Sequence, residues 1–180
     1  MASELNPTTT TDDGLVLKNT ARIEDIASRI DVRVNARLTS WKCNRIIRRD
    51  FNLVSAKLYI RCRDKGSRHQ VLGLLEEMVL QSEFLKGESS QYEISIVITP
   101  TIVPLRIVSP EASMLYKTLM AIDESITRFH CAHLDGIVTR DQLHAAPEMA
   151  LAAYSDLKTY VLGSVSKRTA GELGRENGIT

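Results

Sequence analysis

The sequence predicts an α+β fold, with a small antiparallel sheet and long C-terminal helices. Two runs, 30–38 and 54–62, alternate apolar and polar residues as half-buried strands do. Capped stretches with a helical apolar repeat fill most of the second half. The predicted order β, β, α, β, β, α, α lacks the regular alternation of a βαβ fold. The 180 residues suit one domain at 15–163, with a disordered arm at 1–14 and a flexible tail at 164–180.

The first elements lie before residue 50. A short helix is expected over Ile23–Ile30, and a strand follows to Leu38. Its polar face carries Arg33, Asn35 and Arg37. Ser40 is then the expected cap of a short basic helix from Trp41 to Arg49.

The second alternating run, Val54–Cys62, predicts another strand with a basic face. Its outward residues would be Lys57, Tyr59, Arg61 and Arg63. Asp64–Gly66 is expected to turn the chain. Ser67 and Gln70 then form a capping box that opens a helix ending near Gly87.

Two further strands are predicted at Tyr92–Ile98 and Leu105–Val108. Prolines at 100 and 104 place this pair at a sheet edge or a bulge. Ser109, Pro110 and Glu111 begin a helix that runs to about His133, with Gly136 ending it. Its expected inner stripe is Leu115, Leu119, Ile122, Ile126 and Phe129. Thr139 and Gln142 cap the last helical stretch, which breaks at Pro147 and ends at Gly163.

Charge is strongly segregated along the chain. Residues 29–68 hold twelve Lys or Arg and three Asp, a balance of +9, so the other 140 residues carry −8 of a net +1. This segregation indicates a polyanionic partner. An acidic protein, an anionic membrane surface and an inert solvated face are the alternatives.

Double-stranded DNA is the partner that the alternating strands favour. A two-stranded β-ribbon can enter the major groove, where long polar side chains at every second position reach the bases. The candidate base-reading residues are Lys57, Tyr59, Arg61, Arg63, Arg33, Asn35 and Arg37. The candidate phosphate-binding residues, which would position the protein without reading sequence, are Lys42, Arg45, Arg48, Arg49, Lys65 and Arg68.

Other classes of site find little support. The three cysteines form no CxxC pair, and His130 and His133 are interpreted as capping or packed histidines rather than metal ligands. No hydrolase, phosphate-loop or dinucleotide motif is present, so we expect no cofactor and no enzyme activity, with a nuclease as the remaining enzymatic alternative. Without a secretory pattern or a bilayer-length apolar run, we expect a cytoplasmic protein.

The stretch Pro104–Gln142 carries a family resemblance. It reads PLRIVSPEASMLYKTLMAIDESITRFHCAHLDGIVTRDQ, with a Pro-Leu-Arg strand, Ser-Pro opening a helix, Asp-Glu in mid-helix and Arg-Asp-Gln opening the next helix. These features resemble the AcaB-like family of proteins encoded by conjugative plasmids and integrating conjugative elements. The resemblance extends more loosely from about Leu15.

The resemblance implies a transcriptional regulator, an activator by our interpretation, of conjugative transfer genes. It also implies an elaborated ribbon-helix-helix architecture and a homodimer, and an activator would bring RNA polymerase as a further partner. The chain departs from the simple ribbon-helix-helix order at one point. A strand is predicted after the Ser67 helix, where that order has a second helix. The strand that enters the groove therefore stays open, and the rival function is a non-DNA-binding interaction protein of the transfer machinery.

Overall fold

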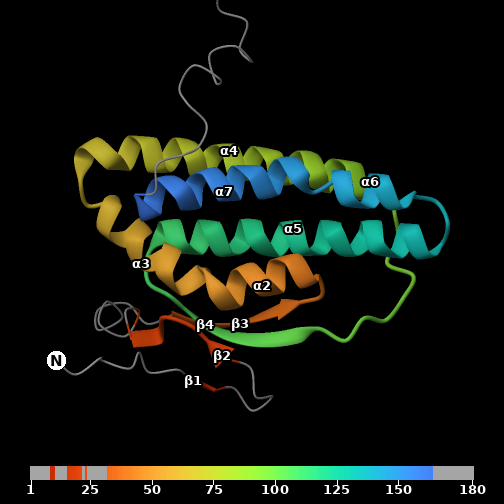
Figure 1. Cartoon of the computed structure of the whole chain (residues 1–180), viewed down its shortest axis with the longest axis horizontal. Coiled ribbons are helices and arrows are strands. Elements are labelled where there is room, and N and C mark those ends of the chain that lie inside the picture. The colour runs from red at the N-terminus through yellow and green to blue at the C-terminus, as the bar shows by residue number, and fades with distance from the viewer. Residues whose placement is uncertain (1–8, 11–15, 22, 24–31, 164–180) are drawn as a thin grey trace, which may run out of the picture.

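A computed structural model of the chain describes residues 9–10, 16–21, 23 and 32–163 (Figure 1). Two short strands, β1 (Thr9–Thr10) and β2 (Val16–Leu17), pair with each other, and β1 falls within the predicted arm. The main body consists of β3 (Val32–Leu38), α2 (Trp41–Arg49), α3 (Phe51–Arg61), α4 (Lys65–Ser89), β4 (Thr101–Ile107), α5 (Pro110–Leu134), α6 (Arg140–Ala145) and α7 (Glu148–Leu162). The fold is α+β, with a small antiparallel sheet and long C-terminal helices, as predicted.

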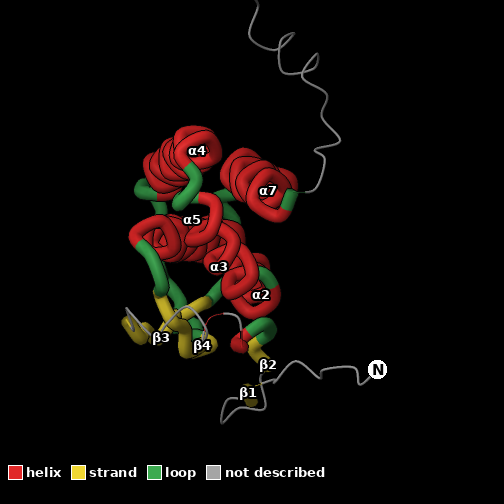
Figure 2. The backbone as a smooth tube through the Cα atoms, turned by 90° about the vertical axis from the view of Figure 1, so that its left-hand side faces the viewer, coloured by secondary structure: helices red, strands yellow, loops and turns green. Residues whose placement is uncertain are grey.

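The elements form layers around α5. Figure 2 shows the β3–β4 ribbon on one side of α5, with α4 and α7 on the opposite side. α5 is the central helix because it is apolar on its predicted inner stripe. All five stripe residues are buried: Leu115, Leu119, Ile122, Ile126 and Phe129.

Strands β3 and β4 form one antiparallel ribbon. Val32 lies opposite Ile107, and Leu38 lies opposite Thr101. The strand predicted to end at Leu38 is confirmed over the residues described. The strand predicted at Leu105–Val108 begins four residues earlier, at Thr101. Pro104 is tolerated because each strand of a two-stranded ribbon has a free edge, where no ladder hydrogen bond is lost.

Most of the predicted helix ends are confirmed. Ser40 caps α2 by accepting a hydrogen bond from the Cys43 backbone, and Ser109 caps α5 ahead of Pro110. Thr139 and Gln142 form the predicted capping box at α6. α7 ends at Gly163, whose φ of 73° is the left-handed conformation that glycine adopts without a steric penalty.

The predicted strand Val54–Cys62 is wrong, because these residues form helix α3 and the turn after it. The run also satisfies a helical repeat: Phe51, Val54, Ser55 and Leu58 follow the spacing i, i+3, i+4, i+7 and are all buried. Packing of this face against α5 and α7 decides between the two periods.

Two smaller expectations also fail. Residues Tyr92–Ile98 form no strand, so the predicted element order is corrected to strand, three helices, strand and three helices within the main body. The helix expected from Ser67 begins at Lys65, and its cap is Asp64, which accepts a hydrogen bond from the Ser67 backbone at 2.9 Å. Residues 24–30 of the helix expected over 23–30, most of the arm and the whole tail lie outside the described residues.

Candidate nucleic-acid interface

The outer face of the β3–β4 ribbon carries the first predicted base-reading set. Arg33 lies opposite Arg106, Asn35 opposite Pro104, and Arg37 opposite Ile102. Arg33, Asn35 and Arg37 are exposed, and Arg106 is half-buried. Neither strand contains an acidic residue. Among the described residues of these two strands, the outward face therefore carries basic side chains and no acidic ones.

The inner face of the ribbon is apolar and attaches it to the helices. Ala36 and Leu38 of β3 are buried, as are Val103, Leu105 and Ile107 of β4. Strand alternation follows from the pleat, so burial of these residues forces the arginines outward. Beside the end of β3 lies a hollow of about 540 Å³, which is lined by Arg37 and Thr39, by Ile94 and Ile98 of the segment before β4, and by the middle of α5.

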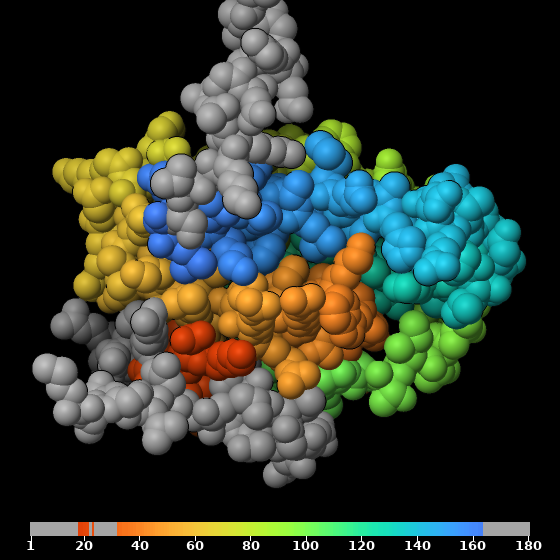
Figure 3. Space-filling view, in the orientation of Figure 1, coloured from red at the N-terminus to blue at the C-terminus, as the bar shows by residue number. Residues whose placement is uncertain are grey.

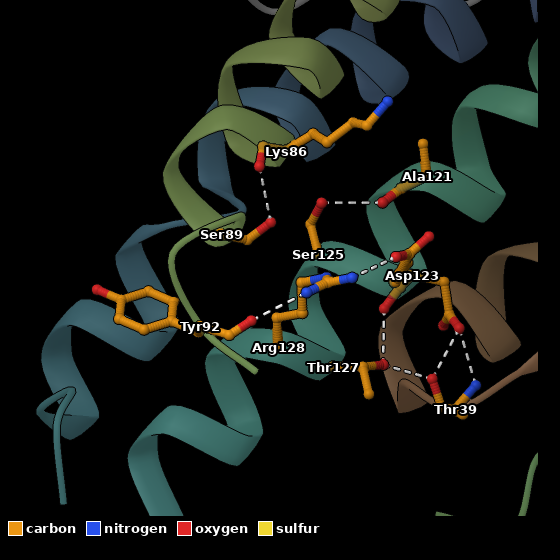
Figure 4. Close-up of polar contacts among 10 residues, drawn as sticks. Thr39, Lys86, Ser89, Tyr92, Ala121, Asp123, Ser125, Thr127 and Arg128 are labelled. Carbon is orange, nitrogen blue, oxygen red and sulfur yellow. Dashed lines mark hydrogen bonds and ion pairs between the residues drawn. The ribbon is translucent and has the colours of Figure 1, made fainter. Parts of the chain in front are cut away.

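A buried carboxylate fixes the turn between β3 and α2 (Figure 4). Asp123 of α5 is 2% exposed, and its Oδ2 accepts hydrogen bonds from the Thr39 backbone N–H and hydroxyl, both at 2.9 Å. Its Oδ1 accepts from the Ser40 backbone N–H at 2.9 Å and from the Ser40 hydroxyl at 2.6 Å. The Thr127 hydroxyl contacts that of Thr39. These bonds position the last residues of β3 and the first turn of α2.

Sequence analysis did not identify this role of Asp123. In the sequence, Asp123 stands out only as part of the Asp-Glu pair in mid-helix, where the two carboxylates occupy adjacent helical positions. Glu124 is exposed and bonds Arg128 at 2.9 Å. The burial of Asp123 could have been predicted from helical spacing, because Asp123 lies one turn after Leu119 on the apolar side of the helix.

Helix α2 holds four of the predicted phosphate-binding residues. Arg45 and Arg49 are exposed, whereas Lys42 and Arg48 are half-buried. The Arg45 guanidinium lies over the Trp41 ring, 5.3 Å from its centroid. Because Ser40 joins α2 directly to β3, these cations lie on the element adjacent to the ribbon.

The second predicted base-reading set does not lie on the ribbon. Lys57, Tyr59 and Arg61 belong to α3, and Arg63 follows it. Arg61 Nε donates to the Val161 carbonyl of α7 at 3.1 Å, and Arg63 stacks over Tyr59 at 4.4 Å. These four residues therefore do not form the alternating face of a strand.

Lys65 and Arg68 are exposed in the first turns of α4. Both views place α4 on the far side of α5 from the ribbon (Figures 1 and 2). Lys65 and Arg68 follow the capping residue Asp64 in the chain. Hydrogen bonds from Ser67 lower the pKa of the Asp64 carboxyl group. These two cations are thus not brought together with the outer ribbon face.

The remaining candidates concern metals and membranes. His133 Nδ1 lies 2.8 Å from the carbonyl oxygen of Val138, in the loop that follows α5, so this ring is hydrogen-bonded within the chain. In the part of the chain that the structure describes, no three His, Cys, Asp or Glu residues converge on a common metal position. No helix among those described residues combines the length and apolarity needed to cross a bilayer.

The fold and this face together define an α+β protein with an exposed basic ribbon backed by a helical body. Among solved structures, the chain is similar to selenomethionine-containing AcaB from uropathogenic E. coli, with a TM-score of 0.59 and 18% identity over 76% of this chain and 80% of that one. The two proteins share a fold, so the predicted AcaB-like resemblance is confirmed at that level. No protein-family model matches the chain, and no curated protein matches it significantly.

Proposed function

We propose that the protein is a sequence-specific DNA-binding regulator of transcription whose β3–β4 ribbon enters the major groove. The outer ribbon face carries the proposal: Arg33, Asn35 and Arg37 stand at alternate exposed positions of an acid-free strand. Arginine pairs with guanine edges and asparagine with adenine edges through two hydrogen bonds. An isolated two-stranded ribbon is also the element that the major groove admits.

The element order supports the same class of protein. β3, α2 and α3 follow one another as strand, helix and helix, the order of a ribbon-helix-helix unit. The elaboration is that β3 pairs with β4 of the same chain, so one chain forms a complete ribbon. In this proposal the cations of α2, among them Lys42 and Arg45, bind phosphates and hold the register of the ribbon.

Binding to duplex DNA tests the proposal directly. The ribbon and α2 together carry seven cations, and neutralisation of about six phosphates predicts a slope near −5 for log K against log[salt]. The measurement is fluorescence anisotropy of a labelled duplex, first with a random-sequence pool and then with the sequences that the protein enriches. If the protein binds no duplex DNA at low salt, the proposal is refuted.

Variants separate base reading from phosphate contact. Asn35→Ala and Arg37→Ala should each cost about 1–3 kcal/mol of discrimination between an enriched and a scrambled duplex. Lys42→Ala should weaken both duplexes alike. Arg68→Ala is the matched control, since it removes an arginine that is also exposed but lies on α4. Equal, sequence-blind losses from the ribbon variants would mean that the ribbon only contacts the backbone.

We propose further that the protein acts as an activator of conjugative transfer genes, with RNA polymerase as a partner, and that it has no enzymatic activity. The shared fold with AcaB and the sequence features of Pro104–Gln142 support this assignment. A reporter fused to a promoter carrying the enriched sequence should rise in expression with the protein and fall with Arg37→Ala. Incubation of bound duplex with Mg²⁺ should leave it uncut; cleavage would favour the nuclease alternative.

A homodimer completes the proposal, with residues 93–99 as the contact between two copies. Ile94, Ile96 and Val97 are 47%, 39% and 97% exposed. Within the described residues, this segment pairs with no strand. Antiparallel pairing with a second copy about Ile96 would set Ile94 opposite Ile98 and the acidic Glu93 opposite Thr99, so no like charges meet.

Light scattering during size-exclusion chromatography measures the oligomeric state. Val97→Lys should convert the dimer to a monomer, because in this register position 97 lies opposite Ser95 and the two introduced cations would be diagonal neighbours on one face near the axis. Ile60→Lys is the control, since Ile60 is 55% exposed on α3. A wild-type monomer at high protein concentration would refute the dimer and leave DNA reading by one ribbon to be judged separately.

A further inference from the structure

A basic pocket lies beside α2, apart from the outer ribbon face. We call it the Trp41 pocket; its lining residues are Lys18, Trp41, Asn44, Arg45, Arg48 and Arg49. It has a volume of about 260 Å³. Figure 3 shows residues 18–21, in red, lying against the orange surface of α2, where this pocket forms.

Helical spacing and one backbone anchor build the pocket. Trp41, Arg45 and Arg49 follow one another at four-residue intervals, so they share one face of α2. Lys18 is held beside this face because its backbone N–H donates to the Arg48 carbonyl at 3.3 Å. Its own carbonyl accepts a hydrogen bond from Asn52 Nδ2 at 3.0 Å.

The lining is mostly cationic. Four of the six lining residues are Lys or Arg, and none is acidic. Arg49 Nε lies 3.8 Å from Asp50 Oδ1, but Asp50 bonds Lys158 more closely, at 2.6 Å. The pocket therefore has a surplus of positive charge, which suits an anion, and guanidinium groups bind phosphate oxygens in pairs.

Two further observations point beyond a simple anion. The Trp41 side chain is 70% exposed, so one large aromatic surface stands at the pocket. Asn44 Oδ1 and Arg48 Nε are buried atoms that find no hydrogen-bond partner among the described residues. Asn44 Oδ1 is an acceptor and Arg48 Nε is a donor, and buried polar atoms of both kinds are normally hydrogen-bonded. A ligand that carries both a donor and an acceptor would pair with both atoms.

We propose that the Trp41 pocket binds a nucleotide, with its phosphate held by the cations and its base stacked on the indole of Trp41. Stacking of a base on an aromatic side chain contributes about 1–3 kcal/mol and tolerates any base. A base inside a duplex has both faces covered by its neighbours. The ligand is therefore a free nucleotide or an unpaired nucleotide of a nucleic acid, and this inference does not depend on how the ribbon reads DNA.

The chain supplies its own reporter, because Trp41 is its single tryptophan. Excitation at the red edge of the indole band isolates it from the tyrosines. The probes are deoxyadenosine monophosphate, deoxyadenosine, inorganic phosphate, a single-stranded oligonucleotide and a closed hairpin duplex. We expect saturable quenching by the monophosphate or the single strand, weaker quenching by the nucleoside, and competition without quenching by inorganic phosphate.

Charge reversal at the rim tests the site with little risk to folding. Arg49 is 58% exposed, and Arg49→Glu should weaken the quenching ligand by about tenfold or more, since a phosphate contact becomes a repulsion. Arg63→Glu makes the same change in charge at another exposed arginine and should alter affinity less than about twofold. Circular dichroism of each variant checks that the fold is retained.

The outcomes are distinct. Quenching by the monophosphate identifies a free nucleotide as ligand, and quenching by the single strand alone identifies an unpaired nucleotide of a nucleic acid. Equal quenching by deoxyadenosine and its monophosphate, equal losses in the two charge-reversal variants, or no saturable quenching would each overturn the proposal. Arg37 lies outside the Trp41 pocket, so Arg37→Ala should reduce duplex discrimination and leave quenching by the monophosphate unchanged, which distinguishes failure of the ribbon proposal from failure of this one.

Discussion

Replacing Asp123 with alanine should destabilise the protein by about 3 kcal/mol. The carboxylate accepts four hydrogen bonds at the turn between β3 and α2 and is 2% exposed. After its removal the two hydroxyl groups can turn to other acceptors, whereas the backbone N–H groups of Thr39 and Ser40 cannot. Each buried, unpaired donor costs about 1–3 kcal/mol, which gives roughly 2–6 kcal/mol for the pair. Relief of the cost of burying a charge offsets part of this loss.

The assay is urea unfolding followed by far-ultraviolet circular dichroism, with a thermal scan alongside. A loss of about 3 kcal/mol should lower the Tm of a chain this long by roughly 6–12 °C. Glu124→Ala is the matched control, because it removes the neighbouring carboxylate from an exposed ion pair with Arg128. That variant should change stability by less than about 0.5 kcal/mol. A loss below about 1 kcal/mol for Asp123→Ala, or equal losses for both variants, would refute the reasoning.

Three further predictions concern thiols, pH and glycine. In the native protein a thiol reagent should modify the half-buried Cys62 well before Cys43, whose pKa burial raises to about 12; equal rates would contradict this. Burial, with nearby positive charges, lowers the pKa of His130, so its protonation is less favourable in the folded state. Stability should then fall as the pH drops below about 6.5, and His130→Gln should reduce that slope in urea titrations at several pH values. Gly163→Ala should cost about 1 kcal/mol, because φ is +73° and the new Cβ would lie 3.2 Å from Arg61. Gly73→Ala should instead gain about 0.5–1 kcal/mol by calorimetry, since it lies within α4 beside open space.

Local signals in the sequence determined several elements by themselves. Strand alternation located β3 and the outward direction of Arg33, Asn35 and Arg37, because the pleat alternates whatever the strand pairs with. Capping residues located the starts of α2, α5 and α6, since unpaired N–H groups at a helix start need a nearby acceptor. The concentration of positive charge in residues 29–68 is likewise set by the sequence alone.

Tertiary structure alone decided the rest. The run 54–62 fits both a strand and a helix, and burial of Phe51 and Leu58 against other helices selects the helix. The partner of β3 is a strand that three helices separate from it in sequence, a pairing that no local pattern specifies. Asp123 accepts hydrogen bonds from Thr39 and Ser40 because α5 packs against the turn between β3 and α2, a contact that the sequence around Asp123 does not specify. The physical reason is common to all three: local patterns set what a segment can bury, whereas contacts between distant segments decide what it does bury.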